Sequence, residues 1–126
     1  MTPATPKIPT PDSLDGLREQ LAAFAEERDW TQFHSPKNLA MALIAECAEL
    51  VEHFQWLTEE QSAALDDDKR EAVSEELADV LIYLIRIADQ LDIDLIGAAN
   101  KKIVKNKQRY PVERVHGDAR RASEYE

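Results

Sequence analysis

Two pairs of carboxylates interrupt the most apolar segments of the sequence. Glu46 and Glu49 lie in the stretch 39–54, which is largely apolar, and Glu76 and Asp79 lie in a second such segment. Residues three positions apart share one face of a helix, so each pair presents two carboxylates side by side. A carboxylate removed from water must be protonated, pair with a cation or bind a metal. The first segment contains no Lys or Arg, so the pattern favours a divalent metal.

The types of the candidate ligands indicate which metal such a site would hold. Oxygen-only ligands fit Mg²⁺ or Mn²⁺, and Mg²⁺ often completes its coordination with water and substrate phosphates. A di-iron carboxylate site requires E-x-x-H motifs, and neither carboxylate segment contains one. The alternative is that these acids form solvated helix stripes, but two matched pairs in apolar surroundings favour metal binding.

A basic segment follows the carboxylates. Residues 101–116 contain six Lys or Arg and one acid, a local charge of +5 in a chain of net charge −10. Lys102, Lys105, Asn106 and Arg109 have the spacing of one helix face, where they could together bind an anion such as phosphate. The alternative is that these cations stabilise the dipole at the end of a helix.

Aromatic residues flank the first carboxylate segment. Trp30, Phe33 and His34 precede it, Trp56 follows it, and Tyr83 lies four residues after Asp79. Their rings could stack on a nucleobase. A core or interface role fits the two tryptophans equally well, and Tyr83 could be an ordinary buried helix residue.

The spacing of apolar residues predicts an all-α chain that positions these groups on four main helices. Apolar residues recur at helical intervals, no segment alternates with a period of two, and only three glycines are present. Ser35-Pro36 is typical of a helix start, and Thr58 with Gln61 predicts a capping box on a short extra helix between the second and third main helices. We expect the four main helices to cover about residues 13–28, 36–56, 69–90 and 94–110.

Composition limits the domain organisation and the partners. With 126 residues the chain forms one domain, which we place at residues 12–111, between a flexible proline-rich leader at 1–11 and a polar C-terminal tail at 112–126. The acidic charge disfavours nucleic-acid binding. A lone cysteine and the lack of a long apolar run disfavour secretion and a membrane partner, so we expect a cytoplasmic protein.

Together these motifs resemble the all-α nucleoside triphosphate pyrophosphatases of the MazG-like superfamily, and within it the dCTP pyrophosphatase group. The matching segments span about residues 14–111, nearly the whole predicted fold. They are Glu27-Arg28-Asp29-Trp30-Thr31-Gln32-Phe33-His34, Asn38-Leu39, Glu46-x-x-Glu49, Phe54-Gln55-Trp56, Glu75-Glu76-x-x-Asp79 with Val80 to Tyr83, and Lys102-x-x-x-Asn106-x-x-Arg109-Tyr110-Pro111.

The resemblance implies a four-helix MazG-like bundle that cleaves a nucleoside triphosphate, with dCTP or a modified dCTP as the expected substrate, to monophosphate and pyrophosphate. It implies that Glu46, Glu49, Glu76 and Asp79 bind Mg²⁺, and we assign Glu49 as the general base. It places the nucleoside against Trp30, Thr31, Gln32, Phe33, His34, Asn38, Trp56 and Tyr83, and the phosphates against Lys102, Asn106 and Arg109.

Two further expectations concern substrate and assembly. Leu21 stands where animal dCTP pyrophosphatases carry a base-pocket histidine, which leaves the base preference open. A broader NTP or dUTP pyrophosphatase, or a nucleotide-binding helical module without turnover, are the alternatives. The second helix is apolar almost all round, so we expect a homodimer or homotetramer.

Overall fold

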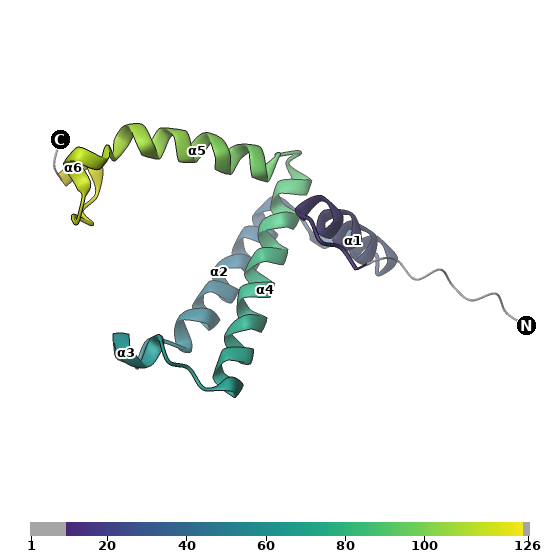
Figure 1. Cartoon of the computed structure of the whole chain (residues 1–126). Coiled ribbons are helices and arrows are strands. Elements are labelled where there is room, and N and C mark those ends of the chain that lie inside the picture. Colours follow the sequence, from purple (N-terminus) through teal and green to yellow (C-terminus); the bar gives the residue numbers. More distant parts are fainter. Residues whose placement is uncertain (1–9, 125–126) are drawn as a thin grey trace, which may run out of the picture. The chain divides into compact units, whose positions relative to one another are not determined.

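The computed structural model describes residues 10–124, and within that range the chain is helical with no strand (Figure 1). The predicted all-α fold is therefore confirmed. The chain divides into two units, residues 1–92 and 93–126, each described by itself. The first unit contains α1 (Leu14–Glu27), the 3₁₀ turn η1 (Thr31–Phe33), α2 (Pro36–Glu52), α3 (Glu59–Ser62) and α4 (Asp67–Gln90); the second contains α5 (Leu95–Arg109), α6 (Val112–Val115) and the 3₁₀ turn η2 (Ala122–Glu124).

The helices begin where their capping residues predict. At the N-terminus of each of the four long helices, a side-chain oxygen accepts a hydrogen bond from a backbone N–H of the first turn. This bond satisfies a donor that has no partner within the helix. These caps are Ser13, Ser35, Asp66 and Asp94. The short helix α3 has the predicted capping box between Thr58 and Gln61.

The predicted end of the second helix was wrong by one turn. We expected it near Trp56, but α2 ends at Glu52. Beyond it the backbone forms tighter, 3₁₀-type hydrogen bonds between residues three positions apart. The Phe54 N–H, for example, donates to the Val51 carbonyl at 2.9 Å. This turn leads the chain to Thr58, which caps α3, so Trp56 lies on a turn and 86% of it is exposed.

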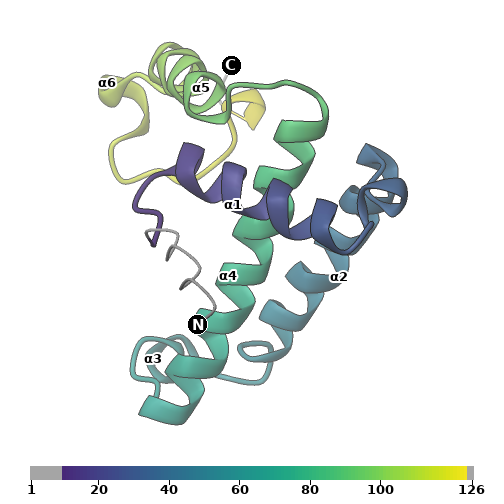
Figure 2. The ribbon, with the colours of Figure 1, turned by 90° about the vertical axis from the view of Figure 1, so that its right-hand side faces the viewer.

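α2 and α4 pack side by side and run in opposite directions (Figures 1 and 2). Their orientation follows from two contacts: His53 at the end of α2 approaches Glu76 early in α4, and His34 before α2 approaches Arg86 late in α4. α1 crosses α4 near the C-terminal end of α4, where Arg18 of α1 approaches Asp89 (Figure 2). The buried apolar side chains of residues 10–124 are Ala25, Leu39, Val73, Ile85 and Ala88.

The second unit contains α5, the short helix α6 and the 3₁₀ turn η2. α5 ends at Arg109 because Tyr110, the residue before Pro111, is pushed out of the helical region. α6 follows within the segment that we expected to be a polar tail. The expected leader at residues 1–11 lies almost wholly outside the described residues. Among residues 10–124, no helix has the length and apolar character needed to cross a bilayer.

Replacing Leu39 with Ala should destabilise the protein by about 2–5 kcal/mol, because Leu39 is 2% exposed and its loss leaves a cavity between α2 and its neighbours. Urea unfolding followed by circular dichroism measures the change. Lys37→Ala, an exposed position on the same helix, is the control and should shift the free energy of unfolding by less than about 0.5 kcal/mol. Equal effects of the two substitutions would contradict this account of the core.

Candidate functional site

The antiparallel pairing of α2 and α4 brings three of the four predicted metal ligands together. Glu46 and Glu49 on α2 and Glu76 on α4 each offer a carboxylate oxygen, and these oxygens lie within 4.8 Å of one another. Asp79 lies one turn after Glu76 on α4, and it is close enough for its charge to act on both Glu46 and Glu76. We call these four residues the carboxylate cluster.

Two oxygens of the carboxylate cluster are buried without a partner. Glu46 Oε2 and Glu76 Oε2 are inaccessible to solvent and accept no hydrogen bond, whereas Glu49 is exposed. Native proteins rarely leave a buried polar atom unsatisfied, because its lost hydration is not replaced. The unpartnered oxygens therefore indicate that another group completes this site.

Burial and mutual repulsion both act on the cluster. Burial, followed by hydrogen bonding to Glu49 and the negative charges of its neighbours, raises the pKa of Glu46 from 4.5 to about 7. Burial is also the largest of the causes that raise the pKa of Glu76, followed by its interactions with Glu49. Both effects disfavour the ionised forms, so the cluster is unfavourable to the fold without a cation.

Within residues 10–124, no Lys or Arg makes a salt bridge to the cluster. The nearest basic group is the His53 ring, whose Nε2 lies 3.8 Å from Glu76 Oε1. Oxygen-only donors with buried, unpartnered atoms fit a hard divalent cation such as Mg²⁺ or Mn²⁺. The donor set therefore passes the chemical test for the metal that the sequence predicts.

The predicted aromatic segment forms a loop at the other end of α2. The rings of Trp30 and Phe24 of α1 form a T-shaped pair with centroids 5.7 Å apart, and the centroid of the His34 ring lies 6.3 Å from that of Trp30. Asn38 donates a hydrogen bond from Nδ2 to the Phe33 carbonyl at 3.1 Å. Thr31 and Gln32 lie in the same loop, and Gln32 donates from Nε2 to the Asp29 carbonyl at 2.9 Å.

Within one chain, Trp56 lies far from this loop. Trp30 and Trp56 lie at opposite ends of α2, whose 17 residues span about 25 Å. Tyr83 is half-buried on α4, one turn after Asp79 and therefore on the same side of that helix. It lies between the carboxylate cluster and the aromatic loop along α4.

Lys102, Asn106 and Arg109 are exposed on α5, in the second unit. Their spacing of four and three residues places them on one stripe of that helix, as predicted. The Arg109 guanidinium lies 5.9 Å from the centre of the Tyr110 ring.

The sequence reasoning missed Arg86, which is buried on α4 and contacts both Asp89 and His34. The signal that could have found it is the one used for the carboxylates, a single charged residue inside the apolar run Leu84 to Ala88. Arg18 of α1 also belongs to this contact, through Asp89.

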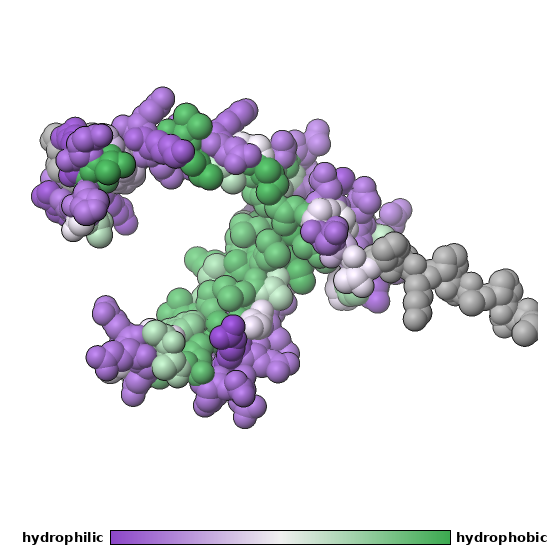
Figure 3. All heavy atoms as spheres, viewed as in Figure 1, coloured by the Kyte–Doolittle hydropathy of each residue, from purple (hydrophilic) through white to green (hydrophobic). Residues whose placement is uncertain are grey.

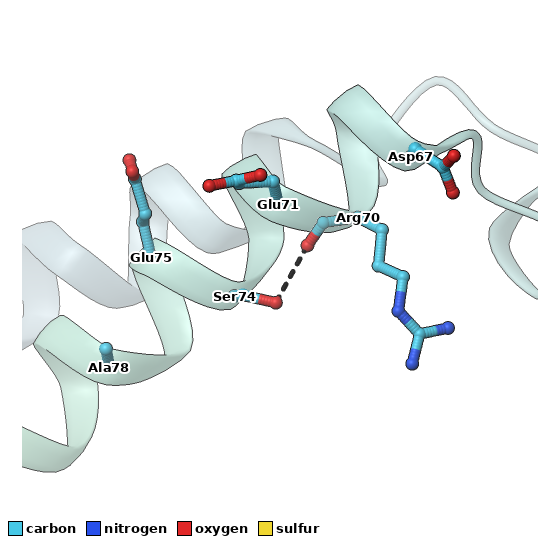
Figure 4. A pocket seen from close by; sticks show the side chains of 6 residues that line it. All are labelled: Asp67, Arg70, Glu71, Ser74, Glu75 and Ala78. Carbon is cyan, nitrogen blue, oxygen red and sulfur yellow. Dashed lines mark hydrogen bonds between the residues drawn. The ribbon is translucent and has the colours of Figure 1, made fainter.

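A surface depression of about 490 Å³ on α4 does not coincide with the carboxylate cluster (Figure 4). Its lining comes from α4 alone, and the Ser74 hydroxyl donates to the Arg70 carbonyl at 2.9 Å. No second element encloses it, and its lining has no buried unpartnered polar atom within the described part of the chain. It is lined by Asp67, Arg70, Glu71, Ser74, Glu75 and Ala78.

Comparison with known proteins identifies the family. The sequence model of the MazG-like family matches residues 42–124, a stretch that includes the whole carboxylate cluster. The chain belongs to the MazG-like family. The predicted resemblance is therefore confirmed.

Individual relatives agree with this MazG-like assignment. The chain is similar to dCTP pyrophosphatase 1 of Mus musculus, at 47% identity over 109 residues, which cover 85% of this chain and 64% of the relative. For the Homo sapiens protein of the same name the identity is 42% over 114 residues, which cover 89% and 67%. This chain thus spans slightly less than two thirds of the mouse relative.

A solved structure has a similar fold. A pyrophosphatase from Archaeoglobus fulgidus DSM 4304 superposes with a TM-score of 0.74 and is 37% identical in sequence. The match covers 83% of this MazG-like chain and 99% of the archaeal one. The helical arrangement described above is therefore one that the archaeal pyrophosphatase shares.

Replacing Glu46 with Gln should stabilise the metal-free protein at pH 8 and have a smaller effect at pH 5. The pKa of Glu46 is about 7 in the fold and near its usual 4.5 in the unfolded chain, so the folded state binds more protons between these values. Stability is therefore lost as the pH rises from 4.5 to 7, and Gln removes that loss. Thermal unfolding in EDTA at the two pH values measures it.

Glu71→Gln provides the control, because Glu71 is an exposed carboxylate on α4 outside the cluster. It should shift the melting temperature similarly at both pH values. If Glu46→Gln changed the melting temperature equally at both pH values, the pKa of Glu46 would not be raised by the fold.

Proposed function

We propose that this MazG-like chain is a Mg²⁺-dependent nucleoside triphosphate pyrophosphohydrolase. It cleaves a deoxynucleoside triphosphate, with dCTP or a modified dCTP as the preferred substrate, to the monophosphate and pyrophosphate. Such an enzyme removes unwanted triphosphates from the nucleotide pool. The single observation that carries the proposal is the carboxylate cluster, with its two buried oxygens that lack any partner.

The relatives supply the reaction class. The mouse and human relatives are dCTP pyrophosphatases by name, and the archaeal structure is that of a pyrophosphatase. The four cluster carboxylates are all present in this chain. These points support the same chemistry for this protein.

We assign the cluster as the metal site. Glu46, Glu49, Glu76 and Asp79 would hold Mg²⁺, with Mn²⁺ as a substitute. When bound, the metal supplies positive charge for the triphosphate and lowers the pKa of coordinated water. The cation would also supply the partner that the buried oxygens of Glu46 and Glu76 lack.

Glu49 is the best candidate for the general base. Of the three residues whose oxygens lie within 4.8 Å of one another, it is the exposed one, so its carboxylate is accessible to a water molecule. The water oxygen forms a bond to the α-phosphorus as the bond from that phosphorus to the bridging oxygen breaks. The water proton passes to Glu49, and pyrophosphate leaves with the bridging oxygen.

The rest of the substrate is assigned by position along the helices. The nucleoside would lie against Trp30 to His34 and Asn38, at one end of the α2–α4 pair, and against Tyr83, which lies between that end and the cluster. The exposed stripe of Lys102, Asn106 and Arg109 would bind phosphate oxygens. Leu21 is half-buried on α1, and its apolar side chain offers no hydrogen bond to a base, so a broader NTP or dUTP pyrophosphatase is the second candidate.

We further propose that the protein works as a homodimer or homotetramer. Figure 3 shows apolar side chains over α2 and α4, and large ones remain exposed there, among them Met41, Ile44, Leu77 and Leu81. Apolar faces of this extent are typical of subunit interfaces. Trp56 could then reach the aromatic loop of a partner, because one chain keeps it at the other end of α2.

A panel of canonical and modified NTPs and dNTPs, incubated with Mg²⁺, tests the activity. We expect dCTP or a modified dCTP to give monophosphate and pyrophosphate in equal amounts by chromatography. EDTA should abolish turnover, and added Mg²⁺ should restore it. Orthophosphate as the first product would contradict cleavage between the α- and β-phosphates, and no turnover of any substrate would favour a nucleotide-binding module.

Glu49→Gln is the variant for the same assay. The substitution keeps the size of the side chain and the helix but removes the proton acceptor, so we expect turnover to fall by at least 10²-fold. Circular dichroism establishes that the variant is folded. Turnover within a few-fold of the parent would exclude Glu49 as the base.

Light scattering at micromolar concentration should give a mass of two or four chains. Replacing Ile44, which is 69% exposed on α2, with Asp should shift the mass toward the monomer, because it buries a charge at the proposed interface. Lys37→Asp, at an exposed polar position of the same helix, is the control. A monomeric parent protein would contradict the proposal.

A further inference from the structure

We propose that Arg86 is a positioning residue for the nucleoside end of the site. It holds His34, and through His34 the aromatic loop of residues 29–34, at a fixed place on α4. This inference rests on the proposed function, because it assigns that loop to the nucleoside. It adds a residue that neither the sequence motifs nor the carboxylate cluster includes.

Arg86 is unusual because it is a cation inside the protein. Only 3% of the residue is exposed, and its neighbours in sequence, Ile85 and Ile87, are apolar. Its Nη1 donates to Asp89 Oδ2 at 3.2 Å, one turn along the same helix. Its Nε is buried and has no hydrogen-bond partner. A salt bridge with Asp89 alone is therefore an incomplete explanation for placing a guanidinium here.

The charge of Asp89 is shared between two arginines. Asp89 Oδ1 lies 3.5 Å from the Nη1 atom of Arg18, which belongs to α1. One carboxylate thus faces two guanidinium groups, and Arg18 also pairs with Asp15 and Glu19 of its own helix, so the positive charge next to His34 is that of Arg86. Burial and this positive charge on Arg86 lower the pKa of His34, so its ring is neutral at neutral pH.

The remaining contact of Arg86 reaches the aromatic loop. Its Nη2 lies 3.4 Å from His34 Nδ1. A guanidinium can only donate, so Nδ1 must accept, and the ring proton of neutral His34 is on Nε2. This contact joins residues 52 positions apart in sequence, and it fixes both the position and the tautomer of the imidazole.

The loop is otherwise held mainly at its two ends. The Trp30 N–H donates to the Ala25 carbonyl at 2.8 Å, and Asn38 binds the Phe33 carbonyl from the first turn of α2. Among residues 10–124, the side-chain hydrogen bond from the loop to α4 is the one at His34, whose ring meets that of Trp30 in an edge-on arrangement. Arg86 therefore determines where the loop lies against α4.

The spacing on α4 connects this loop to the carboxylate cluster. Asp79, Tyr83 and Arg86 are four and three residues apart, so they share one side of the helix. Arg86 lies two turns from Asp79, about 10 Å along the axis. Through Arg86 the helix sets the distance between the loop and the cluster, so losing this contact should weaken substrate binding more than the chemical step.

Steady-state kinetics of Arg86→Met with the best nucleotide of the panel provide the first test. We expect KM to rise about tenfold while kcat stays within about twofold, because the cluster is unchanged. Arg86→Lys should rescue only in part, since one ammonium cannot reproduce the guanidinium fork. Arg18→Met is the matched control: it removes the other arginine on Asp89, and it should leave KM unchanged.

A double-mutant cycle distinguishes positioning from general support of the fold. If Arg86 acts through His34, then His34→Gln should raise KM to a similar extent, and adding it to Arg86→Met should have little further effect. His34→Gln leaves the buried Arg86–Asp89 pair in place, so it tests the proposal even if Arg86→Met fails to fold.

Fluorescence tests the inference independently of turnover. In a Trp56→Phe background Trp30 is the remaining tryptophan, and it reports on the loop. Arg86→Met should shift its emission to longer wavelength and increase its quenching by acrylamide, whereas Arg18→Met should not. A parent without turnover but with this fluorescence change would overturn the proposed function and keep the role of Arg86 in holding the loop.

Three results would overturn the proposal. They are a fall in kcat with an unchanged KM, equal effects of the Arg18 and Arg86 substitutions, and unchanged Trp30 fluorescence in folded Arg86→Met.

Discussion

The repulsion among the clustered carboxylates of α2 and α4 is the constraint on which this structure depends. These two helices make the main packing of the first unit, and their contact brings one carboxylate oxygen each of Glu46, Glu49 and Glu76 within 4.8 Å of one another. Apolar packing around Leu39 and Ile85 stabilises the contact between the two helices, whereas the repulsion among the cluster carboxylates destabilises it. A bound cation reverses the sign of that electrostatic contribution, so the same residues that weaken the metal-free fold would stabilise the loaded one.

The antiparallel arrangement also separates two chemical environments along one helix pair. The middle of the pair carries carboxylates that a cation would stabilise, and one end carries Arg86, a buried cation that approaches a neutral imidazole and an aromatic loop. A nucleotide has the same polarity, with a charged phosphate end and an aromatic base. This correspondence would let one helix pair distinguish the two ends of a nucleotide.

The small core explains why this chain is suited to association. Few apolar side chains are fully buried, while Ile44, Leu77 and Trp56 remain exposed on or beside α2 and α4. A larger core would bury these residues but would also cover the helix faces next to the cluster. The proposed association would leave the cluster accessible and would supply from a second chain the groups that lie too far away in the first.

Local physics allowed the sequence by itself to determine the helices, their caps and the identity of the carboxylates. Ser35, Thr58 and Asp66 cap helices because their side chains bond to backbone groups only three residues away. The end of α2 was misjudged because the apolar pattern continues through the turn to Trp56. Only the tertiary structure decided that Glu46 meets Glu76, that Trp56 is far from Trp30, and that Arg86 reaches His34. These relations join residues distant in sequence, and they depend on the direction in which α4 packs against α2.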